Sequence, residues 1–219
     1  MEFSPHNART PATPPEHDHA SSAAISKNPQ KKEGTVGELL RFSIIALTLV
    51  VLVRFFIATP FIVSGASMED TFETGEYLIV DQVTYRFNAP EHGDVVIFKF
   101  PQNPSKFFIK RIIGTPGDTV TIEKGKVYVR PAGSSEDIEL DEPYIHEMRV
   151  TDAPLSMRLS EGEYFVMGDN RNASSDSRSW GVLPEENIIG RAFIRLFPLN
   201  KITVLPGEYA LDAEIISAP

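Results

Sequence analysis

The sequence predicts a mainly β domain of antiparallel sheets, preceded by one transmembrane helix. The helix is predicted by a single long apolar segment that ends at about residue 58. The β domain is predicted by the short runs beyond this segment, which are rich in Val, Ile, Phe and Tyr, are separated by Gly, Pro, Asp and Asn, and show no long helical period. With 219 residues, the chain has room for one ordinary domain in addition to the helix and the tails.

Charge and cysteine content exclude several classes of function. The formal net charge of -9 argues against nucleic acid as a partner, because phosphate binding needs clustered Lys and Arg. The chain has no cysteine, which excludes disulfides, thiolate metal sites and a cysteine nucleophile. The His17-Asp18-His19 run lacks rigid third and fourth ligands, so neither a metal nor another cofactor is expected.

The N-terminal segment, residues 1–36, is expected to be a disordered tail. It combines several prolines with Ser, Ala, Asn and charged residues, and it shows no apolar periodicity.

Residues 37–58 are predicted to be the transmembrane helix. About 20 residues of helix span a bilayer core of about 30 Å. Basic residues crowd the N-terminal side of the span: Lys27, Lys31, Lys32 and Arg41. On the other side, the next basic residue after Arg54 is Arg86. The positive-inside rule therefore predicts a single-pass protein of the cell membrane, with a cytoplasmic N-terminus and the remaining chain outside. The alternatives are a cleaved signal peptide, whose apolar region would be shorter and nearer the start, and a buried core helix.

The outer part of the chain is predicted to be one β domain, residues 59–205, followed by a C-terminal tail, residues 206–219. A polar, irregular stretch at about 131–160 indicates a small insert. Gly125 is expected to supply the positive φ of a hairpin turn. The predicted strands lie at 77–80, 94–100, 107–113, 119–122, 126–129, 164–167 and 188–197.

Ser67 and Lys110 are the candidate catalytic residues. Ser67 follows a small-residue turn just beyond the apolar segment, and a serine needs a base to become a nucleophile. No histidine stands in a convincing triad position, so Lys110 is the candidate base. A lysine with its usual pKa of about 10.4 is protonated at neutral pH, but burial can lower that pKa by several units. The alternatives are a loop serine and a solvated strand lysine.

Four segments carry further information when they are taken together. They are SGASMEDTF at 64–72, GDVVIF at 93–98, KRIIGTPGD at 110–118 and GDNRNASSDSR at 168–178. In this order, after one transmembrane helix, they resemble the sequence boxes of bacterial type I signal peptidases (leader peptidases), in their compact single-anchor form. The resemblance covers about residues 37–200, and the fourth segment is its most specific part.

The resemblance implies a signal-peptidase-like β domain with a Ser/Lys dyad. Ser67 matches the nucleophile and Lys110 the general base. Ser174 matches a serine that orients the lysine amine, and Asp176 and Arg178 match a charged pair that supports the site. Family members are membrane-bound serine endopeptidases that remove signal peptides from exported preproteins after small residues, typically Ala-X-Ala. The expected partners are therefore preprotein signal peptides and the lipid bilayer.

The oxyanion hole and the substrate pockets are also assigned by this resemblance. The Ser67 backbone N–H is the expected oxyanion donor. Relatives often supply a second donor from a serine two positions earlier, where this chain has Gly65, with Ser64 beside it. Asp70 stands where the family usually has proline. Six residues match positions that line the substrate pockets, with plain core as the alternative: Phe61, Val63, Met68, Phe72, Phe108 and Ile109.

Two other functions remain as alternatives. A self-cleaving SOS-response repressor uses a similar Ser/Lys core, but it would need a DNA-binding N-terminus and no anchor. The other alternative is a catalytically inactive, membrane-anchored binding protein of the same fold. The intact Ser67, Lys110 and Ser174 argue against it, whereas Gly65 and Asp70 leave it open.

Overall fold

The structure is a computed structural model that describes residues 35–56, 58–145 and 154–209. The predicted tail up to residue 34, the His17-Asp18-His19 run, part of the predicted insert and the last ten residues lie outside the described residues.

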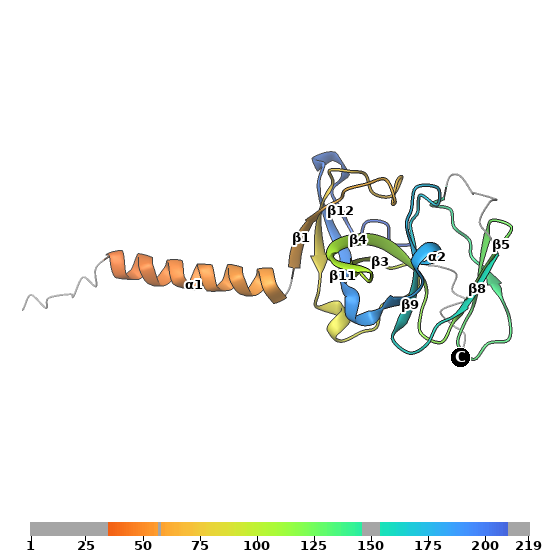
Figure 1. The fold of residues 1–219 in the computed structure, drawn as a ribbon. Helices are drawn as coiled ribbons and strands as arrows, with labels where there is room; N and C mark the ends of the chain where they lie inside the picture. The colour runs from red at the N-terminus through yellow and green to blue at the C-terminus, as the bar shows by residue number, and fades with distance from the viewer. Residues whose placement is uncertain (1–34, 57, 146–153, 210–219) are drawn as a thin grey trace, which may run out of the picture. The chain divides into compact units, whose positions relative to one another are not determined.

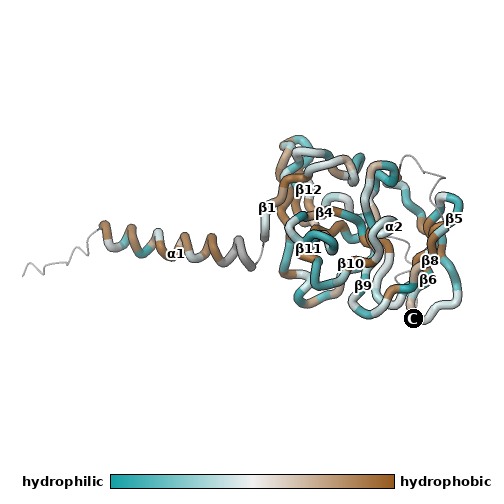
Figure 2. Tube along the Cα trace, viewed as in Figure 1, coloured by the Kyte–Doolittle hydropathy of each residue, from teal (hydrophilic) through white to brown (hydrophobic). Residues whose placement is uncertain are grey.

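The first element is the helix α1, Thr35–Phe56, which has 22 residues. Hydrophobic residues recur along the coloured part of α1 in Figure 2, and large side chains such as Leu39 and Phe42 are exposed. Within the described ranges, none of the helices meets the length and hydropathy needed to cross a bilayer. The predicted span, 37–58, includes residue 57, which lies outside those ranges, so the transmembrane assignment stays a prediction.

The predicted antiparallel β architecture is confirmed by two sheets (Figure 1). The larger sheet has the strand order β1-β2-β11-β3-β4-β9-β10, with β12 paired to β11, and every pairing in it is antiparallel. Its strands are β1 (Ala58–Ile62), β2 (Tyr77–Asp81), β3 (Val95–Phe100), β4 (Asn103–Gly114), β9 (Glu163–Met167), β10 (Leu183–Pro184), β11 (Ile188–Phe197) and β12 (Thr203–Val204).

The smaller sheet has the order β7-β6-β5-β8. Its centre is the predicted hairpin, in which Lys124 and Gly125 form a two-residue turn with positive φ at both positions. The predicted insert contributes the two outer strands, so it extends this sheet. The strands are β5 (Thr119–Glu123), β6 (Lys126–Arg130), β7 (Ile138–Glu139) and β8 (Leu155–Arg158).

Short helical turns complete the described elements: α2 (Ser177–Trp180), η1 (Thr84–Arg86), η2 (Glu185–Asn187) and η3 (Leu199–Lys201).

Strand β4 positions the site because its alternate side chains enter different hydrophobic clusters. Phe108 and Ile112 pack with Val96 and Phe98 of the neighbouring strand β3. Ile109, one position along from Phe108, instead packs against the cluster that lies under the Ser67 turn. Side chains in a strand alternate between its two faces, so Lys110 shares the face of Phe108 and Ile112, and Arg111 points to the other face, as predicted.

The beginning of the predicted C-terminal tail is packed against the domain. The Gly207 carbonyl accepts a hydrogen bond from Arg111, and the ring of Tyr209 lies 5.6 Å from that of Tyr144. The described part of this segment, up to residue 209, therefore belongs to the β domain.

Candidate active site

Ser67 lies in a turn that comes after β1 and is closed by the backbone. The Val63 N–H donates to the Glu76 carbonyl, and the Gly75 N–H donates to the Val63 carbonyl. The Ser67 carbonyl accepts a hydrogen bond of 3.1 Å from the Asn170 N–H, which joins the turn to the 168–178 loop. The serine is thus held by its own turn and by a segment about a hundred residues later in the chain.

Gly168 makes this close approach possible. A Cβ atom at this position would lie 2.3 Å from the Ser67 carbonyl oxygen and 2.3 Å from Ser174 Oγ. No side chain can be accommodated at that distance, so a glycine is required where the loop passes the nucleophile.

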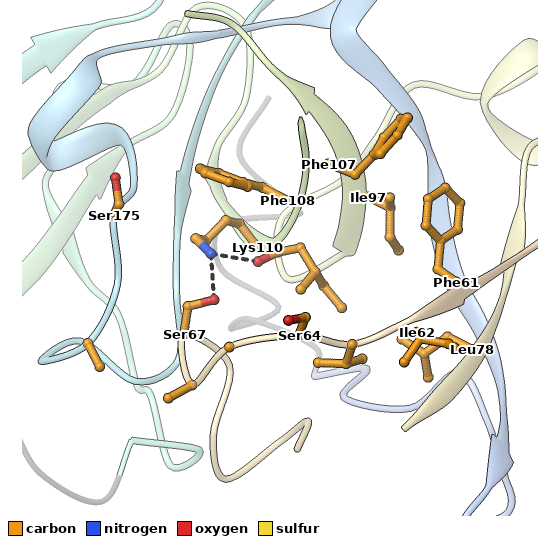
Figure 3. A pocket seen from close by; sticks show the side chains of 15 residues that line it. Phe61, Ile62, Ser64, Ser67, Leu78, Ile97, Phe107, Phe108, Lys110 and Ser175 are labelled. Atoms are coloured by element: carbon orange, nitrogen blue, oxygen red, sulfur yellow. Dashed lines mark hydrogen bonds between the residues drawn. The ribbon is translucent and has the colours of Figure 1, made fainter. Parts of the chain in front are cut away.

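The structure brings the two predicted catalytic side chains into contact (Figure 3). Lys110 Nζ donates hydrogen bonds to Ser67 Oγ at 2.7 Å and to the Ile109 carbonyl at 2.8 Å. The first distance lies within the range of about 2.6–3.2 Å that proton transfer requires. Lys110 is fixed in place because it lies within β4, opposite Val96 of β3.

The environment of Lys110 favours the neutral amine. The residue is only 3% exposed, and its Nζ lies 5.4 Å from the centre of the Phe108 ring. Burial lowers the pKa of Lys110 from 10.5 to about 8, although Asp176 and Asp169 act in the opposite direction. A useful fraction of the amine is therefore unprotonated near neutral pH, which is the state that a general base needs.

The predicted pair of Asp176 and Arg178 is formed. Arg178 Nε and Nη2 donate to the two carboxylate oxygens of Asp176 at 2.8 and 2.9 Å, and the Gly168 N–H donates to the same carboxylate at 3.1 Å. Burial acts to raise the pKa of Asp176, but its hydrogen bonds and the Arg178 charge lower it overall. The carboxylate stays ionised and also caps α2.

Ser174 is placed beside the dyad without joining it. Its hydroxyl oxygen is buried and has no hydrogen-bond partner among the described residues, Lys110 included. The Ser174 hydroxyl lies near the Asp176 carboxylate and makes a minor contribution to lowering its pKa. The two groups are not aligned for a hydrogen bond. The lysine-orienting bond that the resemblance implies is absent between these two described residues, and the Ile109 carbonyl occupies that role instead.

Sequence reasoning missed a second buried ion pair, Arg111 with Asp169. Arg111 Nε and Nη2 donate to the two carboxylate oxygens of Asp169 at 2.9 and 2.6 Å, and both side chains are 1% exposed. Thr71 Oγ1 donates to the same carboxylate at 2.6 Å. The pair thus links the strand of the base to the turn of the nucleophile. Each residue stood next to a recognised motif position, but the sequence carried no signal that joined them.

The insert also reaches this buried region. Glu142 forms a paired contact with Arg171, with a distance of 2.9 Å between Arg171 Nη1 and Glu142 Oε2. The ring of Tyr144 lies 4.0 Å from the guanidinium carbon of Arg111. The sequence predicted the insert but not this contact.

A cleft of about 290 Å³ runs beside the dyad. Four of the predicted pocket residues line it: Phe61, Val63, Phe108 and Ile109. Met68 and Phe72 do not, because the turn after Ser67 directs them into the hydrophobic core, where each is 0% exposed. Other large apolar side chains that were not among the predicted substrate-pocket residues also line it: Ile62, Leu78, Ile97 and Phe107.

The candidate oxyanion donors differ in availability. In the described part of the chain, the Ser67 N–H donates to no backbone carbonyl. The Gly65 N–H, in contrast, donates to Thr74 Oγ1 at 3.0 Å. Ser64 lines the cleft (Figure 3). Gly65 lines the cleft too, but its N–H is already engaged, so Ser64 stays the candidate for a second donor.

Across residues 35–56, 58–145 and 154–209, the structure contains no group of three or more His, Cys, Asp or Glu side chains that could hold a metal ion.

Most of the chain matches the sequence of a known protein family. Residues 36–197 match the family described as signal peptidase, peptidase S26. The chain belongs to this signal peptidase family. The resemblance to bacterial signal peptidases that the four segments predicted is confirmed, because the matched range contains all of them.

Two sequence relatives named as signal peptidases agree with this assignment. The chain is 39% identical over 173 residues to a probable signal peptidase I-1 from Synechocystis sp., covering 76% of this chain and 85% of the relative. It is 34% identical over 200 residues to a signal peptidase I from Leptolyngbya laminosa, covering 88% and 92%. A crystal structure of a signal peptidase I from Enterococcus faecalis is similar at 27% identity and a TM-score of 0.40, covering 48% of this chain and 97% of that one.

Proposed function

We propose that the chain is a signal peptidase I, a serine endopeptidase that removes signal peptides from exported preproteins after small residues. The observation that carries the proposal is the 2.7 Å contact between Ser67 Oγ and the buried Lys110 Nζ. Membership of the signal peptidase family supports the substrate class.

In the proposed mechanism, the neutral Lys110 amine takes the proton from Ser67, and Ser67 Oγ attacks the scissile carbonyl. The Ser67 N–H donates to the oxyanion that forms, with Ser64 as the second donor. The resulting ammonium gives its proton to the leaving amine, which leaves an acyl-enzyme. Lys110 then removes a proton from a water molecule, which attacks the acyl-enzyme and releases the signal peptide.

The supporting residues act on the geometry and the charge of the dyad. Asp176 and Arg178 hold the 168–178 loop against the serine turn, and Arg178 offsets a carboxylate that would otherwise favour the lysine ammonium more strongly. Ser174, whose hydroxyl has no partner among the described residues, is available to bond the amine once it moves during the reaction. The aromatic and aliphatic walls of the cleft suit small substrate side chains.

The membrane anchor is the second part of the proposal. Residues 37–58 hold the β domain at the outer face of the cell membrane, and residues 1–36 remain in the cytoplasm. The support is the apolar composition of this segment and the concentration of basic residues before it. At the membrane surface, the dyad would meet signal peptides that are themselves embedded in the bilayer.

The test uses full-length protein in mild detergent with a purified preprotein. Ser67→Ala and Lys110→Ala should each abolish cleavage, while circular dichroism shows an unchanged fold. Ser134→Ala and Lys126→Ala serve as matched controls, because both residues lie on or beside the smaller sheet and should leave cleavage intact. N-terminal sequencing of the product should show a cut after a small residue. Full activity of either dyad variant would disprove the mechanism.

A further inference from the structure

Four aromatic side chains form a connected group behind the base, here called the aromatic stack: Phe98, Phe100, Phe108 and Trp180. The Trp180 ring lies 6.0 Å from Phe98 and 5.7 Å from Phe100. These two rings lie 6.1 Å and 4.7 Å, respectively, from Phe108. Such separations are in the range in which aromatic pairs attract each other and hold a fixed geometry.

The aromatic stack ends at the amine of the proposed base. The Phe108 ring lies 5.4 Å from Lys110 Nζ, and Lys110 is 3% exposed. Phe100 and Trp180 are half-buried, as is Phe108, which also lines the cleft. The contacts with Phe98 and Phe100 hold the Phe108 ring against the amine, and a gap among these rings would leave Phe108 free to move and would let more water reach the amine.

Trp180 is joined to the site a second time through the backbone. It is the last residue of α2, whose N-cap is Asp176, and its N–H donates to the Asp176 carbonyl at 3.2 Å. Residues 176–180 therefore carry both the Asp176–Arg178 pair and the Trp180 ring of the aromatic stack.

We propose that Trp180 is a positioning residue for the base: through Phe98 and Phe100 it holds the Phe108 ring against Lys110 and keeps the amine out of water. The proposal rests on the proposed role of Lys110. Trp180 touches no reacting atom, so its effect passes through the packing of Phe108 and the hydration of the amine.

The indole N–H plays no part in this role. Trp180 Nε1 is buried and has no hydrogen-bond partner among the described residues. The ring therefore contributes area and shape, and a phenylalanine should replace it far better than an aliphatic residue.

The charged groups that face the amine come from elements outside the aromatic stack. They are Asp169 and Asp176, which favour the ammonium and are each paired with an arginine, Arg111 and Arg178. The aromatic stack contributes no net charge, but the face of the Phe108 ring, 5.4 Å from Nζ, attracts an ammonium. Burial is the largest influence on the pKa of Lys110, so loosening the aromatic stack acts mainly by admitting water. Admitting water favours the ammonium and raises the pKa of Lys110.

The main experiment measures kcat/KM against pH for full-length protein with a peptide substrate. The acid limb of this profile, where kcat/KM rises with pH, reports the pKa of the base. Trp180→Leu should move the acid limb upward by about one pH unit, so that kcat/KM is about tenfold lower at pH 7 and returns to the parent value toward pH 10. Trp180→Phe should leave the acid limb at the pH of the parent protein. Val129→Ala, in the core of the smaller sheet, is the control for general destabilisation and should lower the melting temperature without moving the limb.

An acid limb that stays in place in Trp180→Leu, with only a lower melting temperature, would overturn the proposal and leave a structural role. If Trp180→Leu does not fold, Phe100→Leu tests the same contact between Trp180 and Phe108, and its acid limb should also move upward by about one pH unit. Failure of the proposed function is a different result, because Lys110→Ala would then remain active.

Fluorescence gives a second readout, because Trp180 is the only tryptophan of the chain. Phe108→Leu should increase the quenching of its emission by acrylamide, since the rings between the indole and the amine would lose their packing. Unchanged quenching would show that Trp180 and Phe108 are not mechanically linked, and would also overturn the proposal.

Discussion

Replacing Lys110 by methionine should stabilise the folded protein at neutral pH while removing the proposed base. Methionine has nearly the length of lysine and no charge, so it can occupy the same buried channel between Phe108 and the Ser67 turn. Lys110 is 3% exposed, and folding must therefore strip its ammonium of water. The substitution removes that cost.

The magnitude is set by the pKa of Lys110, which burial lowers from 10.5 to about 8. At about 1.4 kcal/mol per pH unit, keeping a protonated lysine in this site costs about 3 kcal/mol below pH 8. The folded protein binds fewer protons than the unfolded chain between about pH 8 and pH 10.5, so its stability rises with pH in that window. The variant also loses two hydrogen bonds, each worth about 1 kcal/mol. Its net gain near pH 7 is then about 1 kcal/mol.

The assay is urea unfolding of both full-length proteins, monitored by circular dichroism from pH 6 to pH 11. The stability of the variant minus that of the parent should be positive at pH 7 and should fall by about 3 kcal/mol by pH 10.5. Subtracting the two proteins cancels the titration of all other groups that the substitution leaves unchanged. A difference that does not vary with pH would refute the reasoning, because it would mean that the amine is as well hydrated in the folded state as in the unfolded one.

Two further substitutions test the packing around the dyad. Gly168→Ala places a Cβ 2.3 Å from the Ser67 carbonyl and should reduce kcat/KM by about a hundredfold in a preprotein cleavage assay, because the nucleophile is displaced. Gly114→Ala is the control, because it creates a similar clash at 2.5 Å with Val120, away from the dyad. It should lower the melting temperature while most activity is kept. Equal activity losses in the two variants would contradict a specific role of Gly168 in placing the nucleophile. Arg111→Met leaves the Asp169 carboxylate buried without its partner and should cost about 3–5 kcal/mol in urea unfolding. Adding Asp169→Asn should restore part of that stability. Arg130→Met, which breaks the exposed pair with Asp137, is the control and should leave stability nearly unchanged. A loss of stability in Arg111→Met no larger than in this control would show that the Arg111–Asp169 pair does not brace the site.

Local patterns in the sequence predicted the β architecture well. The runs at 107–113, 119–122 and 126–129, predicted from their Val, Ile, Phe and Tyr content, correspond to strands, and Gly125 lies in a hairpin turn. Such features depend on residues that are close together in the chain, and backbone geometry fixes their period. The resemblance to signal peptidases could be recognised for the same reason, because each motif is a short, continuous segment.

The placement of side chains on irregular segments was harder to predict. Met68 and Phe72 were expected in the substrate cleft, but the turn after Ser67 directs them into the core. A strand alternates and can be extrapolated, whereas the direction of a side chain on a turn depends on dihedral angles that the residue types alone do not fix. Ser174 shows the same limit, since its hydroxyl lies beside the dyad without bonding Lys110.

By itself, the sequence determined the β-rich domain, the family and the identities of Ser67 and Lys110 as candidates. Only the tertiary structure decided that these two side chains, 43 residues apart, lie within 2.7 Å, and that Arg111 and Asp169 form a buried pair across 58 residues. The physical reason is that such contacts depend on the register of paired strands and on which carboxylates become buried. Both are settled by the packing of the whole domain, and no short stretch of chain encodes them.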